Sequence, residues 1–160
     1  MDLDLADMIK DATTGVFSTM LGTDLVSHEP FEDPTPFFRS EVTGFIGLAG
    51  DVAGYISVHC SRRQATDFTA RLIGGELDDI TSDDDVRDAV GEITNMVAGN
   101  MKTALSRKGT VEIALPTVTI TPSSEMRVNG SVGLVVPFED YTGQFWIELV
   151  LANGRPLEGP

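Results

Sequence analysis

The segment 81–107, which reads TSDDDVRDAVGEITNMVAGNMKTALSR, constrains the fold more than any other part of the chain because one helical periodicity runs through all of it. Thr81 or Ser82 can cap its start, three aspartates occupy its first turn, and Gly109 follows its end. Acidic residues at the start and basic residues near the end match the helix dipole. Apolar residues recur every three or four positions, as in an amphipathic helix. The buried stripe predicted by this spacing is Val86, Val90, Ile93, Val97, Met101 and Ala104.

The opposite face of this helix carries polar side chains and a glycine. Glu92 and Asn95 are three positions apart, so their side chains are neighbours on the helix surface. Asp88 lies one turn earlier and Gly99 one turn later. A glycine inside a helix costs about 0.5–1 kcal/mol relative to alanine, which suggests that something approaches the backbone at Gly99. Asn100 projects toward the apolar stripe instead, and we expect a hydrogen-bonded amide in the core or an interface.

The run 88–102, DAVGEITNMVAGNMK, resembles the signature helix of the CheC/CheX/FliY family of chemotaxis phosphatases, and most closely that of the CheX branch. The likeness continues in residues 44–75, where two strands flank Gly50-Asp51 and a helix follows. It also includes the strand that begins at Leu115-Pro116-Thr117-Val118. The resemblance implies an α+β fold in which an antiparallel sheet is layered with long helices.

Members of that family hydrolyse the aspartyl phosphate of response regulators such as CheY. The resemblance implies that Asn95 orients the attacking water in line with the phosphorus, and that Glu92 contacts a lysine beside the regulator's phosphorylation site. An amide can accept from water and donate to a phosphoryl oxygen at the same time. Asp88 and Gly99 would border the bound regulator. Lys102 could contact an acidic surface of the regulator or remain a solvated side chain.

The resemblance also bears on cofactors, site number and assembly. No cofactor of the chain's own is expected, because Mg²⁺ would be held by the regulator and no metal-ligand spacing occurs near Asn95. Double-site members carry a second acid-amide pair on an earlier helix, but the middle of the corresponding helix here, Asp7 to Thr14, contains no Glu-x-x-Asn. One site per chain is therefore expected. A homodimer formed by continuing a sheet across two chains is implied as well.

Charge and cysteine content restrict the partners and the compartment. A formal net charge of −14 argues against nucleic acid or an anionic membrane as a partner, because both require basic surfaces. No signal peptide is evident, and no apolar run approaches the roughly 18 residues of a spanning helix, so we expect a cytoplasmic protein. Cys60 is the only cysteine and indicates a reducing compartment. We expect a buried thiol there, since neither His28 nor His59 lies in a catalytic pattern.

The rest of the chain predicts a single domain over 1–151 and a short tail over 152–160. A Gly-Gly pair at 74–75 follows a helix and lacks a downstream Lys-Ser/Thr, so it indicates a helix end rather than a phosphate loop. A bend is expected near Pro116, where the alternation of the strand changes parity. The remaining predicted elements are an amphipathic helix over 2–21, a loop or extended connection over 27–36, a hairpin that turns at 49–51, a helix over 62–73 with Ala65, Phe68, Leu72 and Ile73 inward, and strands over 111–120, 126–136 and 145–151.

The sequence leaves functions from two classes open. The leading hypothesis is a phosphatase of phosphorylated response regulators with Asn95 and Glu92 as its working pair. The alternative is a non-catalytic CheX-like dimeric module that binds a response regulator or another signalling partner. A purely structural dimer would be indicated if both side chains were buried. A hydrolase with its own nucleophile is not favoured, because the sequence contains neither Gly-x-Ser-x-Gly nor His-Glu-x-x-His.

Overall fold

An antiparallel sheet covered by helices on one face forms the fold in the computed structural model, which describes residues 1–33, 40–80, 82–121 and 132–152. The α+β architecture predicted from the sequence is confirmed. The elements in chain order are α1 (Leu3–Val16), the π-helical turn η1 (Phe17–Leu21), β1 (Val26–Ser27), β2 (Phe31–Asp33), β3 (Val42–Gly50), β4 (Gly54–Cys60), α2 (Arg62–Ile73), the 3₁₀ turn η2 (Leu77–Asp79), α3 (Asp83–Leu105), β5 (Val111–Ile113), β6 (Thr117–Ile120), β7 (Gly133–Asp140) and β8 (Gly143–Leu151).

The sheet order is β1-β7-β8-β4-β3-β5, with β2 also paired to β7 and β6 also paired to β3. The long strands β4 and β8 form its centre, and every residue of β4 is buried. The predicted hairpin turns between β3 and β4, and the expected bend falls between β5 and β6, beside Pro116. Short strands therefore form both edges of the sheet among the described residues.

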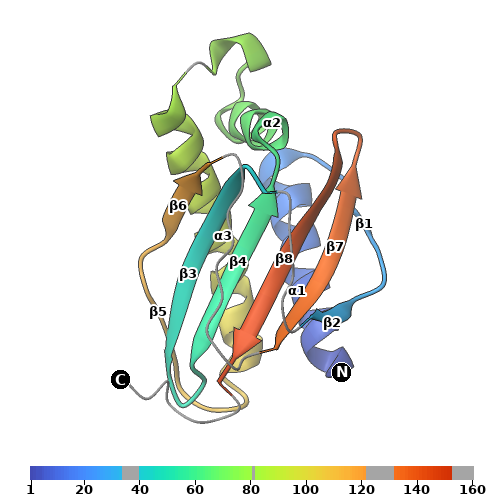
Figure 1. Cartoon of the computed structure of the whole chain (residues 1–160), viewed down its shortest axis with the longest axis vertical. Coiled ribbons are helices and arrows are strands. Elements are labelled where there is room, and N and C mark those ends of the chain that lie inside the picture. Colours follow the sequence, from blue (N-terminus) through green and yellow to red (C-terminus); the bar gives the residue numbers. More distant parts are fainter. Residues whose placement is uncertain (34–39, 81, 122–131, 153–160) are drawn as a thin grey trace.

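Helices α1 and α3 lie side by side behind the sheet in Figure 1, while α2 lies at the end of the sheet where β4 finishes. Helix α3 packs on β3 and β4, and α1 packs on β7. The apolar stripe of α3 is buried as predicted, except that Ala104 is half-buried. Ser82 is the N-cap, since its hydroxyl accepts a hydrogen bond from the Asp85 N–H at 3.1 Å.

A glycine on β3 allows α3 to lie close to the sheet. A Cβ atom at Gly44 would lie 2.1 Å from the hydroxyl oxygen of Thr94, a distance that real side chains do not adopt. The Thr94 hydroxyl donates to the Val90 carbonyl at 2.7 Å, so its orientation is fixed within the helix. The close approach at Gly44 sets the depth at which α3 rests, and thereby its outward face.

An aromatic cluster joins η1 and α2 to the sheet. The ring of Phe145 on β8 lies 5.1 Å from that of Phe17 and 5.6 Å from that of Phe138, and 5.3 Å from that of Phe68 on α2. All four side chains are at most 1% exposed. Helix α2 begins at Arg62 with Ser61 as its N-cap, and the cluster anchors it against the end of the sheet.

Three predictions for segments outside α3 differ from the structure. The region predicted as a loop or extended connection over 27–36 contributes two short strands, because β1 and β2 pair with the distant strand β7. The strand predicted over 126–136 is observed from Gly133 onward, while 126–131 fall outside the described residues. Ile73, the last residue of α2, is 61% exposed rather than inward. Apart from Ala152, the predicted tail also falls outside the described residues.

Cys60 is fully buried at the end of β4. Burial raises the pKa of its thiol to about 12, and the nearby Glu41 carboxylate contributes in the same direction. A thiol that stays protonated at neutral pH is a poor nucleophile, so Cys60 is a packing residue as predicted. Within the described ranges, no helix is both long enough and apolar enough to cross a membrane.

Candidate functional site

The outer face of α3, formed by Asp88, Glu92, Asn95 and Gly99, is exposed at all four positions. In the part of the chain that the structure describes, neither the Glu92 carboxylate nor the Asn95 amide forms a side-chain hydrogen bond or an ion pair. The two groups lie three residues apart on one helix, so they neighbour each other on its surface. An acid and an amide that are both solvent-facing and unpaired are available to an incoming molecule.

A hollow of about 340 Å³ lies beside this face, and we call it the Pro116 hollow. Helix α3 and strand β6 approach closely there, since a Cβ atom at Gly91 would lie 3.6 Å from Val118 and 3.8 Å from Pro116. The Glu92 carboxylate is therefore flanked by the β5–β6 connection. The side chains that line the hollow are those of Arg87, Asp88, Glu92, Pro116 and Val118, together with Gly91.

Lys102 lies seven residues, or about two turns, beyond Asn95 on α3. It is half-buried and borders a different hollow, of about 510 Å³, together with Asp51 and Thr110. The Thr110 N–H and hydroxyl both donate to the Asp51 carboxylate at 3.0 Å, which holds the pKa of that carboxyl below its usual value. The structure thus places Lys102 on the same helix as the acid-amide pair but beside another part of the surface.

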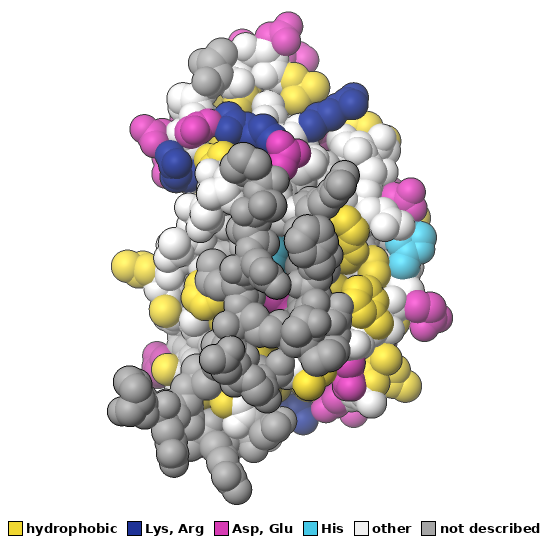
Figure 2. All heavy atoms as spheres, viewed as in Figure 1, with side chains coloured by type: hydrophobic (Ala, Val, Ile, Leu, Met, Phe, Trp, Pro, Cys, Tyr) yellow, Lys and Arg dark blue, Asp and Glu magenta, His cyan; other side chains and the backbone are white. Residues whose placement is uncertain are grey.

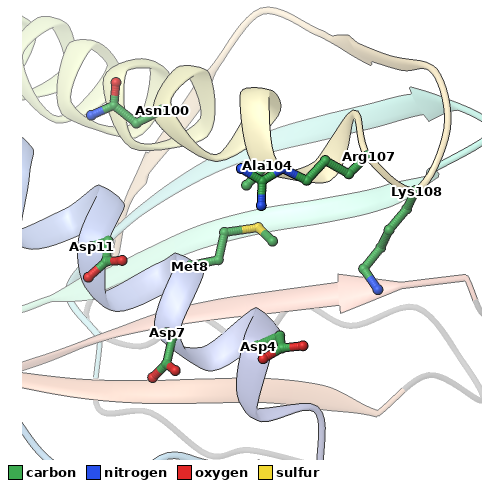
Figure 3. A pocket seen from close by; sticks show the side chains of 8 residues that line it. All are labelled: Asp4, Asp7, Met8, Asp11, Asn100, Ala104, Arg107 and Lys108. Carbon is green, nitrogen blue, oxygen red and sulfur yellow. The ribbon is translucent and has the colours of Figure 1, made fainter.

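A groove between α1 and α3, with a volume of about 570 Å³, contains Asn100, which the sequence predicted as a core or interface amide. Asn100 is exposed and lines this groove, so it is not the core amide that was one of its two predicted roles; the other, an interface amide, stays a prediction. The helical projection put Asn100 toward the apolar stripe, but α1 leaves that position uncovered. Figure 3 shows the groove with Asp4, Asp7 and Asp11 on the α1 wall, Met8 and Ala104 between the helices, and Arg107 and Lys108 at one end.

A buried polar cluster on β4 and β8 was not identified from the sequence. The Nε2 atom of His59 lies 2.9 Å from the Ser57 hydroxyl oxygen and 3.6 Å from a carboxylate oxygen of Glu148. A nucleophilic triad needs the serine and the carboxylate on opposite nitrogens of the histidine, whereas both contact Nε2 here. All three side chains are at most 3% exposed, so the cluster is buried inside the protein. Only the pairing of β4 with β8 brings it together.

The residues that the structure describes contain no candidate metal site, because no three of their His, Cys, Asp or Glu side chains are grouped so that they could hold an ion. The described surface instead offers one helix face with an unpaired acid and amide. An exposed helix face of this kind is a candidate surface for contact with another molecule.

Comparison with known proteins identifies the family. The family model described as chemotaxis phosphatase CheX matches residues 42–139, and the chain belongs to this family. The solved chemotaxis protein CheX from Desulfovibrio desulfuricans is 32% identical over 92% of this chain and 99% of its own, with a TM-score of 0.83. No curated protein matches the chain.

Two further solved structures give the same picture. Chemotaxis protein CheX from Vibrio vulnificus is 26% identical over 92% of this chain and 99% of its own, with a TM-score of 0.81. The CheX of a CheX–CheY–BeF₃–Mg²⁺ complex from Borrelia burgdorferi is 25% identical over 91% of this chain and 96% of its own, with a TM-score of 0.77. The suspected CheX-type membership is confirmed.

Proposed function

We propose that this chain is a chemotaxis phosphatase that hydrolyses the aspartyl phosphate of a CheY-like response regulator in the cytoplasm. The observation that carries the proposal concerns Glu92 and Asn95, which are neighbours on the surface of α3. Both are exposed and lack internal partners among the described residues. Family membership supports a phosphatase, and the related CheX from Borrelia burgdorferi has been solved with CheY, BeF₃ and Mg²⁺. Beryllofluoride mimics a phosphoryl group, so that complex supports a phosphorylated regulator as the partner.

The proposed reaction transfers the phosphoryl group from the regulator's aspartate to water. The oxygen of a water molecule attacks the phosphorus, the bond between phosphorus and the aspartate oxygen breaks, and inorganic phosphate and a free carboxylate are released. Asn95 would accept a hydrogen bond from that water and donate one to a phosphoryl oxygen. Glu92 would hold a lysine ammonium of the regulator by a charge-assisted hydrogen bond. Catalysis of this kind rests on positioning and electrostatics, with little covalent work by the protein.

Partner contacts and assembly complete the proposal. Asp88 and Gly99 would border the bound regulator, and Lys102 would contact it further along α3. Mg²⁺ would belong to the regulator, since carboxylate ligands beside a phosphoryl group suit that ion. A homodimer would continue the sheet at one of its two edges.

Replacing Gly99 with alanine separates folding from partner binding. A Cβ atom at Gly99 would meet nothing within 4 Å, so we expect Gly99→Ala to raise the free energy of unfolding by about 0.5–1 kcal/mol, the usual cost of glycine in a helix. We also expect a higher KM for the phosphorylated regulator, because the added methyl group stands where the regulator would approach the backbone. Urea unfolding and steady-state kinetics measure the two effects. A stabilised variant with an unchanged KM would show that no partner approaches Gly99.

The lifetime of a phosphorylated regulator tests the proposed function. A CheY-like regulator from the same cell is phosphorylated with a radiolabel, and its decay is followed with one tenth as much of this protein added. We expect faster loss of the label, because each chain acts repeatedly. Unchanged decay, with binding of the beryllofluoride-loaded regulator still measurable, would reject the phosphatase and support the non-catalytic docking module.

A further inference from the structure

The outer face of α3 is too small to hold a folded protein partner by itself. A standard protein interface buries roughly 800 Å² on each side, contributed by some 20–30 residues. The outer face consists of four residues along one helix, so a regulator whose phosphoryl group reaches Asn95 must also contact what flanks α3. The two flanks are the groove beside α1 and the β5–β6 connection beside the Pro116 hollow.

The β5–β6 connection presents an exposed apolar side chain, Leu115, one residue before Pro116. Leu115 is 89% exposed, more than any other large hydrophobic residue in the described ranges, where the next is Tyr141 at 66%. Apolar side chains reach the margin of the molecule over β5 and β6 in Figure 2. An exposed leucine by itself is common on a protein surface. This one is adjacent in sequence to Pro116, which lines the same hollow as Glu92.

The backbone around Leu115 is held in place. Ile113 pairs with Leu48 and Thr117 pairs with Phe45, so both ends of the connection are fixed to β3. Between them, the Ala114 N–H donates to the Gly47 carbonyl at 3.0 Å, and the ring of Pro116 restricts its own φ. An apolar side chain on such a rigid support loses little conformational freedom on binding, which is how interface anchors gain affinity.

We propose that Leu115 is the apolar anchor that binds the response regulator and sets its specificity, a proposal that rests on the function given above. The regulator would place an apolar side chain against Leu115 and a basic side chain in the Pro116 hollow, between the carboxylates of Asp88 and Glu92. Clustered apolar contact bordered by charged pairs is typical of the centre of a protein interface.

Charge at the Pro116 hollow favours a regulator over a second copy of this chain as the occupant. A symmetric dimer places the same patch of both chains face to face. Two copies meeting here would bring the carboxylates of Asp88 and Glu92 toward those of the partner copy, and juxtaposed like charges oppose association. Arg87, the basic residue in the lining of the hollow, is already ion-paired with Asp84 at 3.3 Å. A regulator with a basic side chain beside its phosphorylation site complements the same carboxylates.

Substitution of Leu115 by serine tests this proposal, with Val26→Ser as the matched control. Val26 is 60% exposed on β1, at the opposite edge of the sheet. The dissociation constant for a beryllofluoride- and Mg²⁺-loaded CheY-like regulator is measured by fluorescence anisotropy. The KM and kcat for the phosphorylated regulator are measured separately. We expect Leu115→Ser to raise both the dissociation constant and the KM by about tenfold with kcat within twofold, and Val26→Ser to change none of them.

Each contrary outcome rejects the anchor. Equal dissociation constants for Leu115→Ser and the unchanged chain would show that the regulator does not touch Leu115. Loss of self-association in sedimentation, with regulator affinity unchanged, would assign Leu115 to a contact between copies of this chain. If the protein binds the regulator but does not dephosphorylate it, the proposed function fails, while the change in dissociation constant still decides the role of Leu115.

Discussion

Substitution of Asn95 by alanine is expected to lower the kcat for dephosphorylation of the regulator by about 100-fold or more, the scale on which loss of one positioning group slows an enzyme. The Asn95 side chain is exposed and makes no internal hydrogen bond among the described residues. Removing it therefore breaks no hydrogen bond within the described part of the protein, and the free energy of unfolding should change little. Because the amide would contact only the water and the phosphoryl group, the KM should change much less than kcat.

Asn100→Ala is the control for this substitution, since Asn100 is a second exposed amide on the same helix. Asn100 lines the groove beside α1 rather than the outer face of α3. Its removal should leave kcat within about twofold of the unchanged chain. Equal losses of kcat in the two variants would mean that the loss is not specific to the position of Asn95. A fully active Asn95→Ala variant would remove Asn95 from the mechanism altogether.

Substitution of Phe145 by alanine is expected to lower the free energy of unfolding by about 3–5 kcal/mol, the usual range for a fully buried phenylalanine. The ring of Phe145 is 0% exposed and stacks with those of Phe17 and Phe138, and meets Phe68 edge-on. A cavity at this point would remove contacts from η1, α2 and β7 together. A loss of this size is a large part of the roughly 5–15 kcal/mol that stabilises a typical domain.

Urea unfolding followed by circular dichroism measures this effect, with Phe31→Ala as the control. Phe31 lies on the short strand β2 and is 37% exposed, so its truncation should cost about 1 kcal/mol or less. Similar losses for the two variants would show that the aromatic cluster does not dominate the core. If Phe145→Ala costs the expected amount, the dephosphorylation rate of the remaining folded protein should stay near that of the unchanged chain.

The sequence predicted α3 well, because helical periodicity is a local property. The exposed positions Asp88, Glu92, Asn95 and Gly99 and the cap at Ser82 all agree with the structure. The exposure of Asn100, which contradicts a place in the core, shows the limit of this reasoning. A helical projection gives the direction of a side chain, but whether that direction is buried depends on where α1 packs.

Features formed by distant segments could not be predicted in the same way. The Pro116 hollow needs Gly91 of α3 against the β5–β6 connection, and the polar cluster around His59 needs β4 beside β8. Strands β1 and β2 exist only through their pairing with β7, about 100 residues later in the chain. In each case the determining contact is long-range, whereas the periodicities and turn residues used to predict elements are short-range.

The measurement that tests the central claim most directly is the amount of inorganic phosphate released per chain in the steady state. The regulator is present in tenfold excess and is rephosphorylated continuously by a small-molecule phosphodonor. If the acid-amide pair of α3 forms an active site, phosphate release above that of the regulator alone should rise linearly with the concentration of this protein and exceed ten molecules per chain. Phosphate release that equals that of the regulator alone, at every concentration of this protein, would contradict the account.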